Sequence, residues 1–337
     1  MNTEVSGYSA PYRAVITGYG SFAPSKTLTN ATLAKMVDTS DDWITTRTGI
    51  KSRHITTEDE TTAFLATEAA KKALAHARLD PAELQLITVA TITPEMVFPS
   101  TASFVQLNLG AAKAWVFDLC AACSGFVYAV SIAQQFLQSG RYENALIIGA
   151  ETLTKITDFT DRSSCVLFGD GAGAVVLQRC NDHRRGVMYS TMYSDPNSWE
   201  ALNCQAYGSR HPATKKLDDP KKIFMQIKGR EVYQQAVRRI VDTVNECMQQ
   251  CKLTLDDVAM IISHQMNARI IESAAKRLEL PPEKVFLNIA EYGNTSAASV
   301  PIAFDECARK GRIKRGDLVV FVAFGAGLTW GANVIEF

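Results

Sequence analysis

Long apolar runs, an excess of one charge and a secretory cysteine pattern are all missing from this 337-residue chain. No apolar stretch approaches the roughly 18 residues that span a membrane, so no membrane association is predicted. Residues 1–7 contain neither a basic segment nor an apolar one, which predicts no signal peptide. Lys plus Arg and Asp plus Glu both number 35, and this balance argues against a nucleic-acid partner.

Eight cysteines are present, too few for a disulfide framework in a chain of this length. A reducing compartment, the cytoplasm, is therefore predicted. Cys120 and Cys123 have the spacing of a redox dithiol or of half a zinc site. No second pair of this kind and no paired histidines supply the other zinc ligands, so no metal site is predicted, while the dithiol stays open.

The clearest local signal lies around Cys123. Residues 115–117 are apolar and predict a strand, a run of small residues follows, and apolar residues then recur at helical spacing to Leu137. This pattern predicts a strand, a sharp turn and a buried helix, with Cys123 at the first helical turn. The unpaired amides and the dipole of the helix favour a thiolate there, although many buried cysteines are purely structural.

Two glycine-rich segments resemble nucleotide-binding loops without completing them. Residues 18–20 (Gly-Tyr-Gly) lead to Pro24 and polar residues where a dinucleotide-binding helix would begin. Residues 169–173 lead into a strand rather than a helix. Both predict tight, close-packing turns rather than a bound nucleotide.

The second half of the chain repeats the first. Residues 79–91 parallel residues 253–265, roughly 170 positions later, and each copy follows an amphipathic helix and ends in a strand. A second match joins residues 140–141 to residues 311–312, the same Gly-Arg pair at the end of a helix. Two similar α/β halves, each with a mostly parallel sheet, are therefore predicted.

The halves are expected to span residues 1–180 and 181–337 and to pack with pseudo-twofold symmetry. The offset of the second match pairs Cys123 with Asn294 and predicts that both lie on turns facing one cavity. The polar stretch 181–222 predicts a long excursion, and its pattern does not define a structure.

Three more segments carry candidate chemistry. His264 ends a strand, Asn294 lies in a run of small residues, and residues 325–327 (Gly-Ala-Gly) follow the last long strand. Alone, such a histidine or asparagine is more often structural. With Cys123 they supply a nucleophile, two neutral hydrogen-bond donors and backbone amides for an oxyanion.

Taken in order, these motifs resemble the ketoacyl-acyl carrier protein synthase III family of the thiolase-like fold. The resemblance runs from Gly18 to Phe337 and rests on residues 39–44, 47–50, 98–100, 122–125, 168–174, 264–267, 293–299 and 329–331. It implies two pseudo-symmetric α/β halves in a five-layered αβαβα arrangement. Elongating ketoacyl synthases have a second histidine where this chain has Asn294, and thiolases have a second cysteine where it has residues 325–327.

The resemblance implies an enzyme that initiates type II fatty acid synthesis. Cys123 would take a short acyl group from acetyl-CoA or a similar acyl-CoA, while the backbone N–H groups of Cys123 and Ala326 hold the oxyanion. Malonyl-acyl carrier protein would then lose carbon dioxide, and its enolate, bound by His264 and Asn294, would attack the acyl-cysteine. Because acyl-CoA is a substrate, neither a cofactor nor a metal is implied.

The resemblance also implies binding residues. Trp43, Arg47, Arg162 and Asn267 would contact coenzyme A, with Trp43 and Arg162 on the two faces of the adenine, although simple packing also explains a tryptophan.

Gln265 and Arg269 would contact the acyl carrier protein, with ordinary solvated charge as the alternative for Arg269. Phe98 would cross a homodimer interface to line the partner's acyl pocket. The dimer would also cover the sheet edge near residues 115–117.

Two residues depart from the family pattern. Met266 stands where alanine is usual, and Ala326 interrupts a triple glycine. Both lie beside catalytic positions and bear on the acyl group. Three other functions stay open: a related condensing enzyme or acyltransferase of secondary metabolism, a catalytically silent scaffold, and a thiol-redox role for Cys120 with Cys123.

Overall fold

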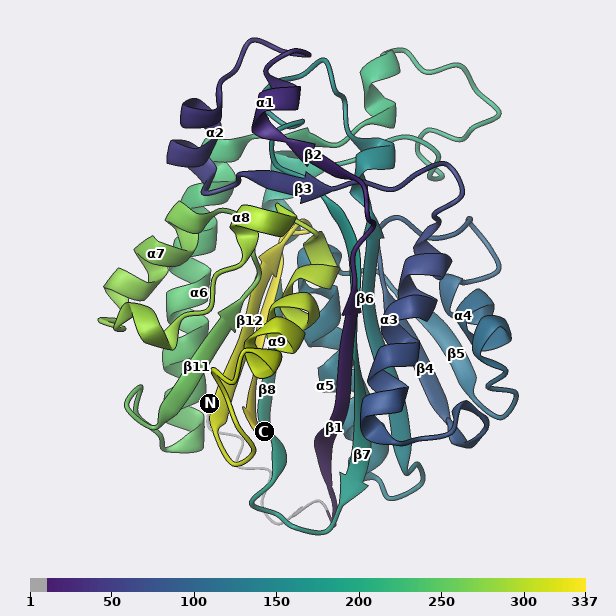
Figure 1. Ribbon diagram of the computed structural model, residues 1–337, viewed down its shortest axis with the longest axis vertical. Coiled ribbons are helices and arrows are strands. Elements are labelled where there is room, and N and C mark those ends of the chain that lie inside the picture. Colours follow the sequence, from purple (N-terminus) through teal and green to yellow (C-terminus); the bar gives the residue numbers. More distant parts are fainter. Residues whose placement is uncertain (1–10) are drawn as a thin grey trace.

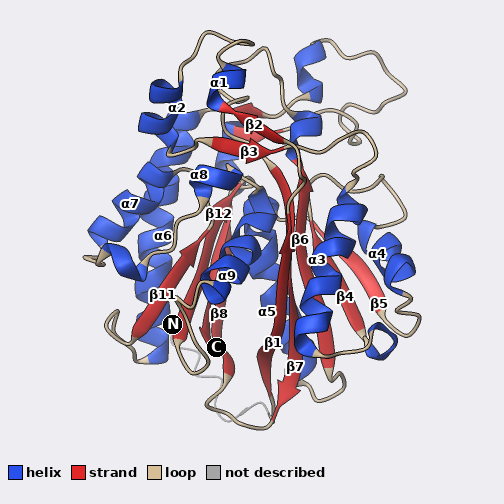
Figure 2. Ribbon diagram, viewed as in Figure 1, coloured by secondary structure: helices blue, strands red, loops and turns tan. Residues whose placement is uncertain are grey.

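The computed structural model of the chain describes residues 11–337, so residues 1–7, which carry the prediction of no signal peptide, lie outside the described part. Two sheets stand side by side, with helices between them and on both outer faces (Figures 1 and 2). Within residues 11–337, no helix combines the length and the apolar character needed to cross a membrane.

The first sheet has the strand order β1-β7-β6-β4-β5. Its strands are β1 (Arg13–Phe22), β4 (Leu86–Ala90), β5 (Trp115–Leu119), β6 (Asn144–Thr152) and β7 (Asp170–Cys180). Strands β6, β4 and β5 pair in parallel, but β7 opposes both of its neighbours. The predicted mostly parallel sheet is therefore mixed, because β7 follows β6 without a long crossover helix, and such a direct return runs antiparallel.

The second sheet repeats this order as β8-β13-β12-β11. Its strands are β8 (Gly186–Ser194), β11 (Val258–Ser263), β12 (Leu318–Gly325) and β13 (Thr329–Glu336). The counterpart of β5 is reduced to one bridge between Ile261 and Val285. The predicted boundary at residues 180 and 181 lies in the connection between β7 and β8. Strand β8 falls inside the supposed excursion, where its polar, edge-strand sequence hid it.

The helices form three layers. Helices α5 (Gly125–Gln138) and α9 (Ser299–Arg309) lie between the sheets, and one apolar cluster joins them to strands of both. The outer faces are covered by α3 (Thr62–Ala77) and α4 (Thr101–Leu109) on one side and by α6 (Gly229–Cys251) and α7 (Ala268–Arg277) on the other. This is the predicted αβαβα arrangement.

Each half carries an insertion after its first strand, and both insertions lie at the same end of the molecule (Figure 1). The first contains β2 (Thr27–Thr29), α1 (Asn30–Leu33), α2 (Asp41–Thr48) and β3 (Ser52–His54). The second contains the short paired strands β9 (Leu202–Asn203) and β10 (Gln226–Ile227). Helix α8 (Ile289–Tyr292) lies below the first insertion. Together these segments cover the end of the sheets where the candidate site lies.

The register of the internal repeat differs from the predicted one. Helix α5 has 14 residues, whereas α9 has 11. The short 3-10 turns before them, Ala122–Ser124 and Ser296–Ala298, are equivalent. Cys123 therefore corresponds to Ala297, and Asn294 corresponds to Cys120. The predicted pairing of Cys123 with Asn294 is wrong by three residues, because it carried the register across helices of unequal length.

Candidate active site

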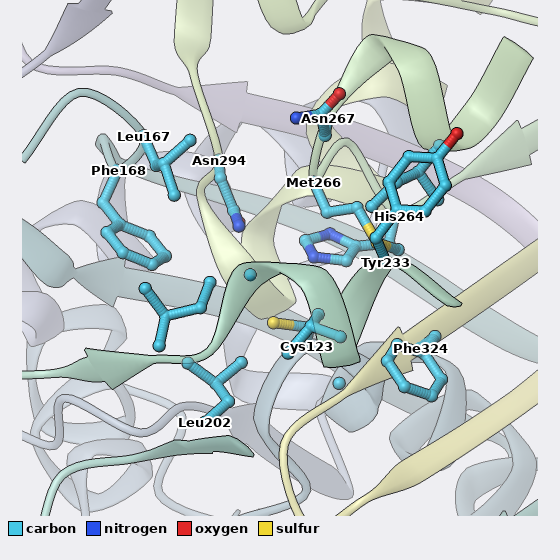
Figure 3. A pocket seen from close by; sticks show the side chains of 15 residues that line it. Cys123, Leu167, Phe168, Leu202, Tyr233, His264, Met266, Asn267, Asn294 and Phe324 are labelled. Carbon is cyan, nitrogen blue, oxygen red and sulfur yellow. The ribbon is translucent and has the colours of Figure 1, made fainter. Parts of the chain in front are cut away.

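One pocket brings Cys123, His264 and Asn294 together (Figure 3). It encloses about 610 Å³, counting the open space at its mouth, and both halves contribute to its wall. Cys123 lies in the turn before α5, His264 follows β11, and Asn294 precedes the turn before α9. The three residues predicted to act together are thus neighbours in space, although 171 positions separate the first from the last.

Cys123 is held in an environment that protects its proton. Its side chain is buried, with 6% of the residue exposed. Burial raises the pKa of the Cys123 thiol to about 12, and the smaller opposing effects of the Ser296 hydroxyl and the Cys123 backbone N–H do not overcome it. Burial thus opposes the thiolate that the helix N-terminus was predicted to favour, and the stabilisation of that thiolate stays a prediction.

His264 is also neutral. Its backbone N–H donates to the Val322 carbonyl (2.8 Å), which fixes the residue to the neighbouring strand β12. Its Nδ1 lies 2.6 Å from the Ser299 hydroxyl, and the residue is 1% exposed. Burial lowers the pKa of the imidazole to about 3. Because Nδ1 is engaged by Ser299, Nε2 is the ring nitrogen left for the pocket.

Asn294 has its backbone and its amide oxygen engaged. Its N–H donates to Leu167 (2.9 Å) and its carbonyl accepts from Gly169 (3.0 Å). The side-chain Oδ1 accepts from the Ser296 N–H at 2.9 Å. The Nδ2 amide group is left as the donor, and it points toward Cys123 and His264 in Figure 3. The pocket therefore presents an amide donor beside the imidazole.

Gly325, the last residue of β12, packs directly on the nucleophile. A Cβ built there would lie 2.7 Å from the Cys123 nitrogen and 2.9 Å from its Cβ. Only a glycine lets the two backbones approach this closely. The contact brings the adjoining Ala326 loop next to Cys123, where the sequence predicts the two amides of an oxyanion hole.

Thr329 and Ser124 hold this loop in place. The Thr329 hydroxyl lies 2.9 Å from the carbonyls of both Ala121 and Ala326. In return, the Ser124 hydroxyl donates to the Thr329 carbonyl at 2.9 Å. The segments that carry Cys123 and Ala326 are thus linked by hydrogen bonds on both sides, which keeps their backbones in a constant relative position.

The wall of the pocket is apolar, and part of it was not predicted. Leu202 and Ile227 are paired neighbours in β9 and β10, and Tyr233 comes from α6. None of these three residues was predicted, because the polar residues around Leu202 form no recognisable pattern. Met266, singled out as a departure, lies on the same wall and is buried. A side chain larger than alanine therefore occupies the wall beside His264.

Two guanidinium groups lie over the indole ring of Trp43. Arg47 lies 4.5 Å and Arg162 4.7 Å from the centre of the indole ring. Arg162 also forms an exposed salt bridge with Asp38 at 3.2 Å. Asn267 lines the pocket and donates from Nδ2 to the Arg47 carbonyl (3.1 Å), so the four predicted CoA residues form one group. An adenine stacked between Trp43 and Arg162 requires Arg162 to move away from the ring.

Gln265 corrects one prediction. It is 1% exposed, its amide donates to the Ser263 and Phe286 carbonyls, and its Oε1 accepts from the Asn288 N–H. A side chain so enclosed cannot contact a carrier protein, and its role is to tie the end of β11 to the segment before α8. The other predicted carrier residue, Arg269, is exposed on α7.

Phe98 and Cys120 lie away from the pocket of their own chain. Phe98 is 82% exposed, and Cys120 is an exposed free thiol. Neither lines the pocket with Cys123. The C-x-x-C spacing therefore does not bring both of its thiols into the site. Across residues 11–337, no group of His, Cys, Asp and Glu side chains is placed to hold a metal ion.

Glu151 is a buried acid beside the site that the sequence reasoning did not single out. It is the last residue but one of β6, is 0% exposed, and accepts hydrogen bonds from the hydroxyls of Thr91 and Thr93 and from the Ile92 N–H. Burial raises the pKa of its carboxyl to about 7. Its charge in turn contributes to the raised pKa of the Cys123 thiol. Nothing in the local sequence marks it, because its burial comes from distant strands.

Comparison with known proteins places this geometry in a family. Residues 117–196 match the model of 3-oxoacyl-[acyl-carrier-protein (ACP)] synthase III, and residues 248–337 match its C-terminal model. The chain belongs to the 3-oxoacyl-[acyl-carrier-protein] synthase III family. Cys123 lies in the first matched range, and His264 and Asn294 lie in the second. Synthase III proteins are acyltransferase enzymes, and the predicted family and enzyme class are confirmed.

Similar proteins cover almost the whole chain. A beta-ketoacyl-[acyl-carrier-protein] synthase III of Caldanaerobacter subterraneus is 52% identical over 96% of this chain and 97% of that relative. The crystal structure of the synthase III of Aquifex aeolicus is 47% identical, covers 96% of this chain and all of that one, and has a TM-score of 0.89. A priming beta-ketosynthase of the R1128 polyketide pathway is 33% identical over 98% of both chains, with a TM-score of 0.89. The synthase III fold predicted from the sequence is therefore confirmed.

Proposed function

We propose that this chain joins a short acyl group, delivered as acyl-CoA, to malonyl-acyl carrier protein with loss of carbon dioxide, through an acyl-Cys123 thioester. The arrangement that carries the proposal is a buried thiol facing two neutral donors, His264 and Asn294, in one apolar pocket. A thiol suits acyl transfer, and neutral donors suit an enolate. Initiation of fatty acid synthesis is the pathway that fits this chemistry.

The first half-reaction transfers the acyl group. The Cys123 sulfur attacks the thioester carbonyl, and the new carbon–sulfur bond places negative charge on the carbonyl oxygen. The backbone N–H groups of Cys123 and Ala326 hold that oxygen. Collapse expels the CoA thiolate, which takes up the proton lost by Cys123. The high pKa of the thiol favours a proton transfer that accompanies the attack over a preformed thiolate.

The second half-reaction forms the carbon–carbon bond. The malonyl thioester loses carbon dioxide, and the electron pair of the broken bond makes an enolate. His264 Nε2–H and Asn294 Nδ2–H donate to its oxygen, and neither is acidic enough to protonate its carbon. The carbon attacks the acyl-Cys123 carbonyl, and the Cys123 thiolate leaves and recovers a proton from water. The product is a 3-oxoacyl-acyl carrier protein.

Coenzyme A is proposed to enter past Trp43. Adenine would displace the Arg162 guanidinium from the Trp43 ring and then stack between the indole and that guanidinium. Arg47 would pair with a phosphate. Asn267 lies between this mouth and the catalytic residues, where a pantetheine amide would pass. Arg162 is free to move because its side chain is 43% exposed.

The carrier protein is proposed to dock on α7. Arg269, Lys276 and Arg277 are exposed on this helix, and Arg269 comes two residues after Asn267, which lines the pocket. An acidic carrier would be attracted to this basic face at the mouth of the pocket. Gln265 is not part of the surface, because it is buried.

A homodimer is proposed along the edge of the first sheet. Strand β5 ends the strand order, so its outer edge has no partner in the described chain. Val97, Phe98 and Leu107 expose 75% or more of their surface in the neighbouring loop and in α4. A second copy seated on this edge would bury them and bring Phe98 toward the acyl end of the partner's pocket.

Intact-protein mass spectrometry tests the proposal. The protein is incubated with acyl-CoA thioesters from acetyl to decanoyl, including branched chains, and then with malonyl-acyl carrier protein. One adduct of acyl mass is expected on the wild type and none on Cys123→Ala. The acyl adduct is expected to disappear when malonyl carrier is added. An adduct retained by Cys123→Ala, or one that malonyl carrier does not discharge, would contradict the proposal.

The same set of acyl-CoA thioesters distinguishes fatty acid initiation from a role in secondary metabolism. The likeness to a priming polyketide synthase keeps a condensing role in secondary metabolism as the second candidate. That role is favoured if the enzyme accepts acyl groups longer than four carbons and rejects acetyl. Met266 beside His264 is the residue expected to set this limit.

A further inference from the structure

Ser299 is the one side chain bonded to the imidazole of His264 in the described structure. It is the first residue of α9, it is 2% exposed, and its hydroxyl oxygen lies 2.6 Å from Nδ1. The same oxygen accepts the backbone N–H of Gln265 at 3.3 Å. The hydroxyl oxygen therefore has two hydrogen-bonding partners, Nδ1 and the Gln265 N–H. The Gln265 N–H is a donor whether or not Nδ1 carries a proton.

The protons of this group of three can be assigned. Because Gln265 donates to the Ser299 oxygen, the hydroxyl proton needs an acceptor, and no other acceptor for it is found in residues 11–337. If Nδ1 accepts it, every polar atom is satisfied. If Nδ1 instead carries a proton and donates, the oxygen receives two hydrogen bonds and its own buried proton has none, which is costly.

We propose that Ser299 is a positioning residue that donates to Nδ1 and thereby holds His264 in the tautomer protonated at Nε2. The inference rests on the proposed condensation, in which Nε2–H donates to the enolate oxygen. The Asn294 amide is oriented in a similar way. The Ser296 N–H donates to its Oδ1, which leaves the Nδ2 donor facing the pocket. Both groups are thus set as donors before substrate arrives.

The two half-reactions depend on this tautomer differently. Decarboxylation needs a donor at Nε2, because a lone pair there would repel the enolate oxygen. Acyl transfer is helped by the oxyanion amides of Cys123 and Ala326, which Ser299 does not touch. Loss of the Ser299 hydroxyl should therefore slow decarboxylation much more than acylation of Cys123.

Two substitutions and one control measure this difference. Ser299→Ala removes the hydroxyl, Ser299→Thr keeps it, and Ser131→Ala removes another buried hydroxyl of the central layer, which donates to the Val127 carbonyl at 2.8 Å. Release of labelled carbon dioxide from malonyl carrier and acetylation of Cys123 are timed separately. Ser299→Ala should lose roughly 10- to 100-fold in decarboxylation and less than about 3-fold in acetylation.

Ser299→Thr should recover most of the decarboxylation rate, and Ser131→Ala should leave both rates near those of the wild type. Equal losses in both half-reactions for Ser299→Ala, or an unchanged decarboxylation rate, would overturn the proposal. If the Thr variant does not fold, the wild type still decides the question through its own spectrum.

Nuclear magnetic resonance of the wild type labelled with ¹⁵N-histidine reads the tautomer directly. The five histidines are few enough to assign His264 by comparison with His264→Gln. A proton on Nε2 is expected from pH 6 to 8, and a proton on Nδ1 would refute the inference. Failure of the wild type to acylate or decarboxylate would instead refute the proposed function, while the spectrum would still report the tautomer.

Discussion

Ala122 and Ser296 adopt the same left-handed backbone conformation, with φ angles of 46° and 47°, at equivalent turns of the two halves. Each precedes by three residues the start of a central helix, α5 or α9. A residue with a Cβ costs about 1–2 kcal/mol in this conformation. In one half the turn presents the Cys123 thiol, and in the other it brings the Ser296 N–H to Asn294. The shared strain thus shapes both sides of the pocket.

The positive φ of Ala122 predicts how the unfolding free energy depends on the side chain at this position. Ala122→Gly relieves the backbone strain but raises the conformational entropy of the unfolded chain. These effects oppose each other, so the unfolding free energy should stay within about 1 kcal/mol of the wild type. Ala122→Val places a β-branched residue at positive φ and should lose at least about 2 kcal/mol. Urea denaturation measures both. A valine variant as stable as the glycine variant would mean that this turn is not constrained.

The contact of Gly325 with Cys123 predicts a loss of acyl transfer on adding one methyl group. Gly325→Ala would place a Cβ 2.7 Å from the Cys123 nitrogen, so one of the two segments must shift. The rate of Cys123 acetylation should fall at least roughly 100-fold. Gly208→Ala is the matched control, because a Cβ there meets nothing within 4 Å. Equal acetylation rates in the two variants would show that the contact does not matter.

The raised pKa of Cys123 predicts how its alkylation depends on pH. Because the thiolate is the reactive form and the pKa of the thiol is about 12, the thiolate fraction rises about tenfold per pH unit throughout pH 6–9. Iodoacetamide labelling of the Cys123 peptide, followed by mass spectrometry, should rise in proportion without a plateau. The exposed Cys120 lies on the same peptide, so fragment ions that separate the two cysteines assign the label to each. A plateau below pH 8 would indicate an activated thiolate.

The Trp43 site predicts an effect confined to substrates that carry adenine. Trp43→Ala should raise KM for acetyl-CoA by roughly 10-fold, because one face of the adenine stack is lost. Acetyl-pantetheine lacks the nucleotide, so its kcat/KM should change by less than about 2-fold. Steady-state kinetics with both substrates makes the comparison within one variant. A proportional loss with acetyl-pantetheine would mean that Trp43 supports the fold instead.

The pKa of Glu151 predicts a change in stability with pH. The pKa of its carboxyl is raised from 4.5 to about 7 in the folded state, so between these values the folded protein holds a proton that the unfolded chain has lost. This group's stabilising contribution is complete below pH 4.5 and is lost as pH rises to about 7. Glu151→Gln does not titrate, so its stability relative to the wild type should rise by roughly 3 kcal/mol between pH 4.5 and 8.

Urea denaturation of both proteins across this pH range measures the effect. Since all other groups titrate in both proteins, only the difference between the two curves is informative. Parallel curves would show that Glu151 is ionised in the folded state at all these pH values.

Cys123 and its turn could be read from local sequence, because a strand, a run of small residues and an amphipathic helix are each specified by residues close together in the chain. The repeat also predicted two similar halves, and short motifs in order indicated the family. His264 and Asn294 followed from those motifs. Strand β8 and the pocket residues Leu202 and Ile227 were missed, because an edge strand and a pair of two-residue strands need little apolar sequence.

What tertiary structure decided was how distant segments meet. The unequal lengths of α5 and α9 set the true register of the repeat. The burial of Gln265 removed it from any docking surface. The sign of the Cys123 pKa shift came from desolvation by surrounding elements, which outweighs the hydrogen bonds that lower the pKa. The hydrogen bond from Ser299 to His264 joins residues 35 positions apart. Local sequence specifies strands, turns and helices, whereas burial and proton placement depend on which of them pack together.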